Sequence, residues 1–262
     1  MMAAMKHAPG SPARTTARRR RLAPWLLLCL IHASCLAREP DWHDYAALLA
    51  AHVHAGERGG IALNLVDYAA WASDPHYPAA LAALENFPLT QLDGAREQLA
   101  FHINAYNLLA IRMVIAHRPL HSIKDVGNLL WPVWKRRAGH LGGEALSLDD
   151  IEHKRLRVLG DARLHFAIVC ASLSCPDLRA EPYRAMQLDA QLDAQVQSFL
   201  ANSGKGLQPA TDAVHVSRIF AWFAEDFAAQ GGVAAFITRY HALPAGAAVK
   251  ADLDYDWRLN GR

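Results

Sequence analysis

The order of apolar and polar positions predicts a helical first half for this chain. Apolar residues recur at helical spacing over residues 41–56. A longer helix is predicted from Thr90, where Thr90 and Asp93 fit a capping box, through to Ala116, because Pro119 follows shortly afterwards. These patterns place two amphipathic or buried helices before residue 120.

The second half alternates between shorter helices and a few strands. Ser147 and Asp150 fit a capping box at the start of another helix, and residues 164–170 form a short, apolar, partly β-branched run that predicts a buried strand. Further patterns predict a helix over residues 186–200, a hairpin over 206–220, a helix near 222–229, a helix after Gly232 and a strand over 249–257. The predicted fold class is α+β, a predominantly helical single domain with a small β-sheet or hairpins.

The N-terminal segment has the pattern of an export signal. Arg18–Arg21 form a positive cluster, and an apolar run, Leu22–Ile31, ends near small residues that fit a cut after Ala37. We therefore predict a signal peptide over residues 1–37, a single globular domain over 38–262, and a periplasmic or secreted protein with no membrane span after signal removal. An uncut anchor, a lipoprotein with Cys35 lipidated, and twin-arginine export are the alternatives.

Removing this segment changes the charge and the number of cysteines. Residues 1–37 hold six of the 27 Lys and Arg and no acid, so the remaining 225 residues carry 21 basic against 25 acidic residues, a net of −4. A slightly acidic domain does not predict nucleic-acid binding. Of the four cysteines, Cys29 and Cys35 leave with the signal, and Cys170 and Cys175 remain.

The residues with the strongest chemical potential lie between Glu152 and Cys175. A cysteine thiolate is a strong nucleophile that needs a nearby imidazole or cation, and His153 on the preceding helix fits that role. His165 precedes Cys170 by five residues, so on a regular strand the two side chains would face opposite sides. Within this stretch the sequence favours His153 over His165 as the base.

Four interpretations of Cys170 and Cys175 remain open. A disulfide between them suits an oxidising compartment. A free reactive thiol, metal ligation together with a histidine, and inert buried thiols are the others. The sequence contains no Gly-rich phosphate loop and no His-Glu-x-x-His, so we predict no cofactor.

Two amides interrupt an apolar helical face within residues 101–107. Asn104 and Asn107 share one stripe of the predicted helix, and a buried amide needs hydrogen-bond partners. In a structural role, they would satisfy the backbone of a neighbouring irregular loop. In a functional role, one of them would polarise a substrate carbonyl or orient a histidine.

Several motifs in one order resemble a known family. They are Phe101–Asn107, Ser122-Ile123-Lys124-Asp125, Ile151-Glu152-His153 with Arg157, His165 through Cys170 to Ser174-Cys175-Pro176, Ser217-Arg218-Ile219-Phe220, and Tyr255-Asp256-Trp257. Over roughly residues 90–240 the chain resembles domain of unknown function 547. This resemblance implies a domain found in exported bacterial proteins, without an activity to carry over.

We predict from the residues a cysteine-dependent hydrolase or acyltransferase acting on a small-molecule or peptide-like ligand. Cys170 or Cys175 would attack an acyl group, His153 would act as base and Glu152 would orient it. Asn104 or Asn107 would stabilise the oxyanion. The alternative is a non-enzymatic extracytoplasmic binding or scaffold module with a structural Cys170–Cys175 disulfide.

Overall fold

We describe residues 39–262 of the chain in a computed structural model, in which the helices are accompanied by three small sheets. The predicted signal, with Cys29 and Cys35, lies outside the described residues. The helices are α1 (His43–His52), α2 (Tyr68–Ser73), α3 (His76–Glu85), α4 (Ala95–His117), α5 (Leu148–Ile151), α6 (Leu188–Ala201), α7 (Ile219–Trp222), α8 (Ala224–Ala228) and α9 (Val233–Thr238). The strands are β1 (Val53–Arg58), β2 (Ile61–Val66), β3 (Arg137–Leu141), β4 (Glu144–Ser147), β5 (Leu207–Pro209), β6 (Ala213–Ser217) and β7 (Ala248–Leu253).

Short single-turn helices connect these elements. They are the 3₁₀ helices η1 (Leu89–Gln91), η2 (Ile123–Val126), η3 (Val133–Lys135), η5 (Arg157–Leu159), η6 (Ala162–Phe166) and η7 (Ala185–Gln187), and the π-helical turn η4 (Glu152–Leu156). The predicted α+β class, mainly helical with small sheets, is confirmed.

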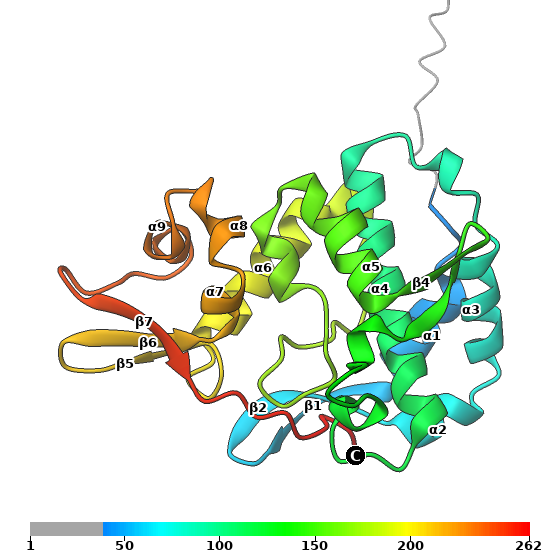
Figure 1. Ribbon diagram of the computed structural model, residues 1–262, viewed down its shortest axis with the longest axis horizontal. Coiled ribbons are helices and arrows are strands. Elements are labelled where there is room, and N and C mark those ends of the chain that lie inside the picture. The colour runs from blue at the N-terminus through cyan, green and yellow to red at the C-terminus, as the bar shows by residue number, and fades with distance from the viewer. Residues whose placement is uncertain (1–38) are drawn as a thin grey trace, which may run out of the picture. The chain divides into compact units, whose positions relative to one another are not determined.

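The elements form two groups with separate hydrophobic cores. Figure 1 shows α1, α3, α4 and α5 on one side and the β5–β6–β7 sheet with α7, α8 and α9 on the other, with α6 between them. In that sheet β6 pairs antiparallel with β5 and parallel with β7. Phe166 lies at the centre of the second core, where it contacts the rings of Phe199, Phe220, Phe227 and Phe236.

Helix α4 is the centre of the larger core. By length and composition it would be long enough and apolar enough to cross a membrane. However, 83% of its apolar window is buried inside the fold. Its apolar side chains are therefore already in contact with protein, as expected for the core helix of a globular domain.

Several predicted elements are confirmed, and others differ from the prediction. The Ser147–Asp150 capping box is formed, and α6 and the β5–β6 hairpin lie where the pattern placed them. The helix predicted over 41–56 ends at His52, and the chain continues as β1. The Thr90–Asp93 capping box is wrong, because residues 89–91 form their own turn and α4 begins after Gly94.

The buried strand predicted over residues 164–170 is also wrong. Residues 162–166 form η6 instead, and the following residues run as irregular backbone. Every residue from Leu164 to Val169 is buried, and such a fully apolar run lacks the periodicity that separates a strand from a helical turn. At the start of η6, the Asp161 carboxylate accepts a hydrogen bond from the Arg163 N–H, which favours the helical turn.

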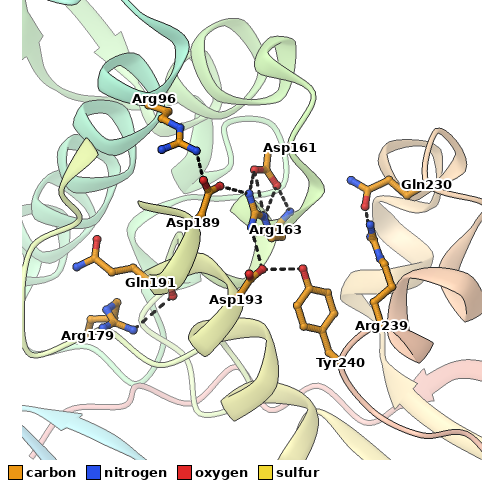
Figure 2. A network of polar contacts seen from close by, with 10 residues as sticks. All are labelled: Arg96, Asp161, Arg163, Arg179, Asp189, Gln191, Asp193, Gln230, Arg239 and Tyr240. Atoms are coloured by element: carbon orange, nitrogen blue, oxygen red, sulfur yellow. Dashed lines mark hydrogen bonds and ion pairs between the residues drawn. The ribbon is translucent and has the colours of Figure 1, made fainter. Parts of the chain in front are cut away.

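A cluster of charges fixes η6 against α6. Figure 2 shows the Arg163 guanidinium between the carboxylates of Asp161, Asp189 and Asp193, with donor–acceptor distances of 2.7 to 3.2 Å. The Tyr240 hydroxyl, from the residues after α9, donates to Asp193 at 2.8 Å. Only 18% of the Arg163 side chain is exposed, so the guanidinium is largely shielded from water, although Asp189 and Asp193 are about half exposed.

We expect Arg163→Gln to lower the free energy of unfolding by about 2 kcal/mol, because three carboxylates lose their shared cation. Urea unfolding measures this change. Arg96→Gln is the matched control: Arg96 also pairs with Asp189 but is 61% exposed, so its loss should cost at most about 0.5 kcal/mol. Equal losses for the two variants would contradict a structural role for the cluster.

Candidate active site

A cavity of about 230 Å³ lies where both groups of elements meet the irregular segment after η6. Its walls are mostly aromatic and apolar, with a few titratable groups. The lining residues are Tyr106, Trp134, Asp149, Glu152, His153, His165, Ile168, Cys170, Cys175, Pro176, Ile219, Trp222, Phe223, Tyr255 and Trp257. An apolar cavity with a few convergent polar groups is the usual form of a small-molecule site.

The chain turns sharply at Cys170, on the cavity wall. Ala171, directly after it, has a φ of 58°, which lies in the left-handed region that disfavours residues with a Cβ. The segment returns so that the Cys170 N–H donates to Cys175 Sγ at 2.8 Å. The Ala171 carbonyl accepts from Asn260, so the C-terminal residues hold this turn in place.

Both cysteines are free thiols in this structure, and their environments differ. The hydroxyls of Ser172 and Tyr255 lie 3.0 and 3.2 Å from Cys170 Sγ and can donate to a thiolate. Burial raises the pKa of the Cys170 thiol, but hydrogen bonds with Cys175, Ser172 and Tyr255 outweigh burial and bring that pKa below its usual range. Burial holds the pKa of Cys175 well above the usual range. Cys170 is thus the more easily ionised thiol.

His165 also lines the cavity, contrary to the sequence prediction that it faces away from Cys170. The η6 turn replaces the expected strand, so the alternation argument does not apply. His165 Nε2–H donates to Asp226 Oδ2 at 2.6 Å, and its Nδ1 is buried without a partner among residues 39–262. Burial lowers the pKa of His165 to about 4 despite the Asp226 hydrogen bond, so the ring is neutral near pH 7.

Asp226 is itself held in place by Arg157. The Arg157 guanidinium binds both carboxylate oxygens, with Nε 2.7 Å from Oδ2 and Nη2 2.8 Å from Oδ1. The Arg157 hydrogen bonds and the His165 contact lower the pKa of Asp226, so Asp226 stays ionised. A neutral imidazole oriented by a fixed carboxylate is the base half of a catalytic triad. Sequence reasoning found no signal for Asp226 and missed this pair.

His153 and Glu152 line the cavity as the sequence proposed, but they are not paired with each other. The His153 ring is half exposed, and its Nδ1–H donates to the Asp149 carbonyl at 3.2 Å. Glu152 Oε1 is buried and has no hydrogen-bond partner in the described part of the chain, so Glu152 does not orient His153. Both residues lie at the start of the π-helical turn η4, a widened turn that often occurs at functional sites.

Burial raises the pKa of Glu152 to about 7, while neighbouring His153 and Arg157 oppose the shift. A carboxyl group with such a pKa is partly protonated at neutral pH and can donate a proton.

Asn104 and Asn107 hold loops and do not line the cavity. The Asn107 amide donates to the Ala167 carbonyl and accepts from the Val169 N–H, each at 2.9 Å. Asn104 makes the same pair of bonds with the Tyr183 backbone, at 2.8 and 2.9 Å. The predicted oxyanion role gains no support, because both amides are engaged with backbone groups; the arrangement is the structural one that the sequence also allowed.

The described residues bring together one group of three metal-type ligands, and it does not contain the cysteines. His43, Asp44 and His76 lie with their ligand atoms within 4.8 Å of one another on α1 and α3. His76 Nδ1 is 2.6 Å from Asp44 Oδ1, so the two side chains already form a hydrogen bond. Within residues 39–262, the predicted alternative of a metal held by Cys170, Cys175 and a histidine therefore finds no matching group.

Comparison with known families gives a match to the segment that contains part of this site. The family described as "Protein of unknown function, DUF547" matches residues 89–200. Over this segment the chain is similar to the DUF547 family. No curated protein and no solved structure matches the chain.

The DUF547 match begins where the sequence resemblance did and ends at residue 200 rather than near 240. Glu152, His165 and Cys170 lie inside the DUF547 segment, whereas Asp226 and Tyr255 lie after it. The cavity therefore needs residues that follow the matched segment.

We expect Glu152→Gln to stabilise the protein at alkaline pH and to leave it unchanged near pH 4. The folded state raises the pKa of Glu152 from 4.5 to about 7, so the folded protein holds this proton more tightly than the unfolded chain. The stability that protonated Glu152 contributes is complete below pH 4.5, the pKa in the unfolded chain, and is lost as the pH rises through about 7, the pKa in the folded protein.

Thermal unfolding across this pH range measures the effect, with an expected gain on the order of 2 kcal/mol above pH 7. The matched control is Glu225→Gln, which removes an exposed carboxylate on α8. A stability gain for Glu152→Gln that is the same at pH 4 and pH 8 would contradict the raised pKa.

Proposed function

We propose that the cavity is the active site of a cysteine-dependent hydrolase or acyltransferase. The observation that carries the proposal is the Cys170 thiol, whose pKa is lowered, on the wall of a cavity that His165 also lines. His165 is in turn hydrogen-bonded to Asp226. Thiolate, imidazole and carboxylate are the three parts that nucleophilic catalysis by cysteine uses.

The proposed reaction proceeds through a thioester. Cys170 Sγ attacks the acyl carbon, a C–S bond forms, and the carbonyl electron pair moves to oxygen. When the carbonyl re-forms, the bond to the leaving group breaks, and protonated Glu152 gives the leaving group its proton. Neutral His165 then removes a proton from water or another acceptor, which attacks the thioester and releases Cys170.

Tyr255 is the proposed oxyanion donor in place of Asn104 and Asn107. Its hydroxyl lies 3.2 Å from Cys170 Sγ, close to where the oxyanion would form. Burial and the nearby Cys170 and Cys175 thiols raise the pKa of Tyr255 well above 10, so the hydroxyl keeps its proton.

The proposed setting is outside the cytoplasm, in the periplasm or in the secreted fraction, as the N-terminal pattern predicts. In an oxidising compartment Cys170 can either stay a free thiol or form a disulfide with Cys175. A stable disulfide would favour the alternative function, a binding or scaffold module, so the redox state separates the two.

Iodoacetamide should alkylate Cys170 in the folded, unreduced protein and leave Cys175 unlabelled. Because hydrogen bonds lower the pKa of Cys170, the rate should reach half its plateau below the roughly 8.5 of an ordinary thiol. Peptide mass spectrometry locates the adduct at each pH. The Cys175→Ala variant should move the midpoint to higher pH, since Cys175 contributes to the lowering.

No adduct on either cysteine until a reductant is added would remove the nucleophile and support the disulfide-containing module instead. An unshifted midpoint near pH 8.5 would contradict an activated thiol.

Acyl transfer itself can be tested with p-nitrophenyl acetate. We expect a burst of p-nitrophenolate and one acetyl group on Cys170, both lost in Cys170→Ser. Asp226→Asn and His165→Gln should slow turnover by about a hundredfold or more, because the imidazole loses its orientation or is absent. The matched control His153→Gln should change turnover by at most about threefold if His165 is the base.

Thermal unfolding of each variant confirms that the fold is kept. A large loss in His153→Gln with none in Asp226→Asn would assign the base to His153 and contradict the role of His165. Unchanged turnover in Cys170→Ser would contradict the proposed mechanism altogether.

A further inference from the structure

Three consecutive large apolar side chains project into solvent between η2 and η3. Leu129 is 100% exposed, Leu130 85% and Trp131 63%. Three other large apolar residues are exposed among the described residues, Val158, Met186 and Trp222, and these lie far apart in the sequence. A contiguous exposed apolar run of this kind marks an interaction site more often than chance exposure does.

An ordered turn presents these side chains. The Asn128 carboxamide oxygen accepts from the Leu130 and Trp131 N–H groups, at 3.0 and 2.8 Å, and the Asn128 N–H donates to the Trp131 carbonyl at 3.0 Å. At the base of the turn, a Cβ on Gly127 would lie 2.4 Å from the Val133 nitrogen. The backbones approach so closely there that only glycine fits, and the turn is closed at its base.

The flank of the turn is basic, in contrast to the rest of the domain. Lys135, Arg136 and Arg137 are exposed, and none of them forms an ion pair with a carboxylate of residues 39–262. Residues 118–140 hold five Lys and Arg and a single acid, Asp125, whereas residues 38–262 together carry a net charge of −4. Asp125 is engaged in the capping box of Ser122.

We propose that this turn, residues 128–131, is an interfacial anchor that inserts into an anionic phospholipid surface. Leu129, Leu130 and Trp131 enter the boundary between headgroups and acyl chains, where leucine and tryptophan are favoured. Lys135, Arg136 and Arg137 face the phosphates of the headgroups. An apolar tip beside unpaired basic residues fits a lipid surface better than a protein groove, which would leave the three cations without partners.

The anchor lies next to the cavity along the chain. Trp134, three residues after Trp131, is part of the cavity wall. Docking of the turn would therefore hold one wall of the cavity close to the lipid surface. The anchor does not depend on the proposed enzymatic function, because it uses no cavity residue.

Hydroxyl-radical footprinting of the full chain tests the anchor locally. Vesicles of equal parts phosphatidylglycerol and phosphatidylcholine should reduce oxidation of Trp131 severalfold, while oxidation of Met186, 84% exposed elsewhere on the fold, stays unchanged. Vesicles of phosphatidylcholine alone should protect Trp131 much less, because each cation near an anionic surface strengthens binding about fivefold. Unchanged oxidation of Met186 would also show that the vesicles do not shield the whole chain from radicals.

Variants separate the apolar and basic contributions. The double variant Leu129→Ser with Leu130→Ser should weaken vesicle binding by about a hundredfold, from the lost apolar burial, whereas the exposed-site control Val158→Ser should not weaken it. The triple variant Lys135→Gln, Arg136→Gln and Arg137→Gln should abolish the preference for phosphatidylglycerol. Unchanged thermal unfolding midpoints show that these variants stay folded.

Equal oxidation of Trp131 with and without anionic vesicles would overturn the proposal, even if the chain as a whole sediments with them. Equal protection by neutral and anionic vesicles would overturn the role of the basic flank. Protection of Trp131 by an added protein but not by vesicles would replace the lipid surface with a protein partner.

Discussion

Residues 167–176 cross the interior without a regular partner strand or helix, so their buried backbone groups take hydrogen bonds from side chains and from the C-terminal residues. Asn107 on α4 supplies two of these bonds, to Ala167 and Val169, and Asn104 gives the same support to Tyr183. Leaving such a buried backbone group unpaired costs about 1 to 3 kcal/mol. The position of Cys170, and with it the cavity, depends on this support from α4.

The cavity joins segments that are far apart in sequence. Glu152 comes from the turn after α5, Cys170 from the irregular segment, Ile219 from α7 and Tyr255 from the residues after β7. The Ser174 hydroxyl accepts from the Asp256 N–H at 2.8 Å, so the C-terminal segment is fixed directly to the cysteine loop. The DUF547 segment supplies the thiol and His165, and the rest of the chain supplies the carboxylate and the phenol that complete the site.

Local signals predicted much of the fold and part of the site. The Ser147 capping box, α6 and the β5–β6 hairpin depend on neighbouring residues, and their patterns were correct. Glu152, His153, Cys170 and Cys175 all line the cavity, and the catalytic roles that the sequence suggested for them stay predictions. These features need only short-range sequence information.

The remaining features depend on contacts between distant residues. The turn η6 forms where a strand was predicted: besides the local Asp161 cap, Arg163 binds Asp189 and Asp193 on α6, and no local pattern encodes those contacts. Because η6 replaces the predicted strand, His165 lines the cavity, although the sequence argument had disfavoured it as the base. Asp226 carries no signal in its own segment, because its role depends on Arg157 and His165, 69 and 61 residues away.

The π-helical turn after α5 also makes the length of this segment matter. A π turn holds one residue more than an α-helical turn, and each residue in an α-helix advances the side chains by about 100°. Deleting one residue from 152–156 would restore regular α-helical winding. If Asp149 keeps its place on the cavity wall, Arg157 would then rotate about the helix axis and no longer face Asp226. The number of residues between Glu152 and Arg157 therefore matters as much as the identity of either residue, because it fixes the directions in which their side chains point.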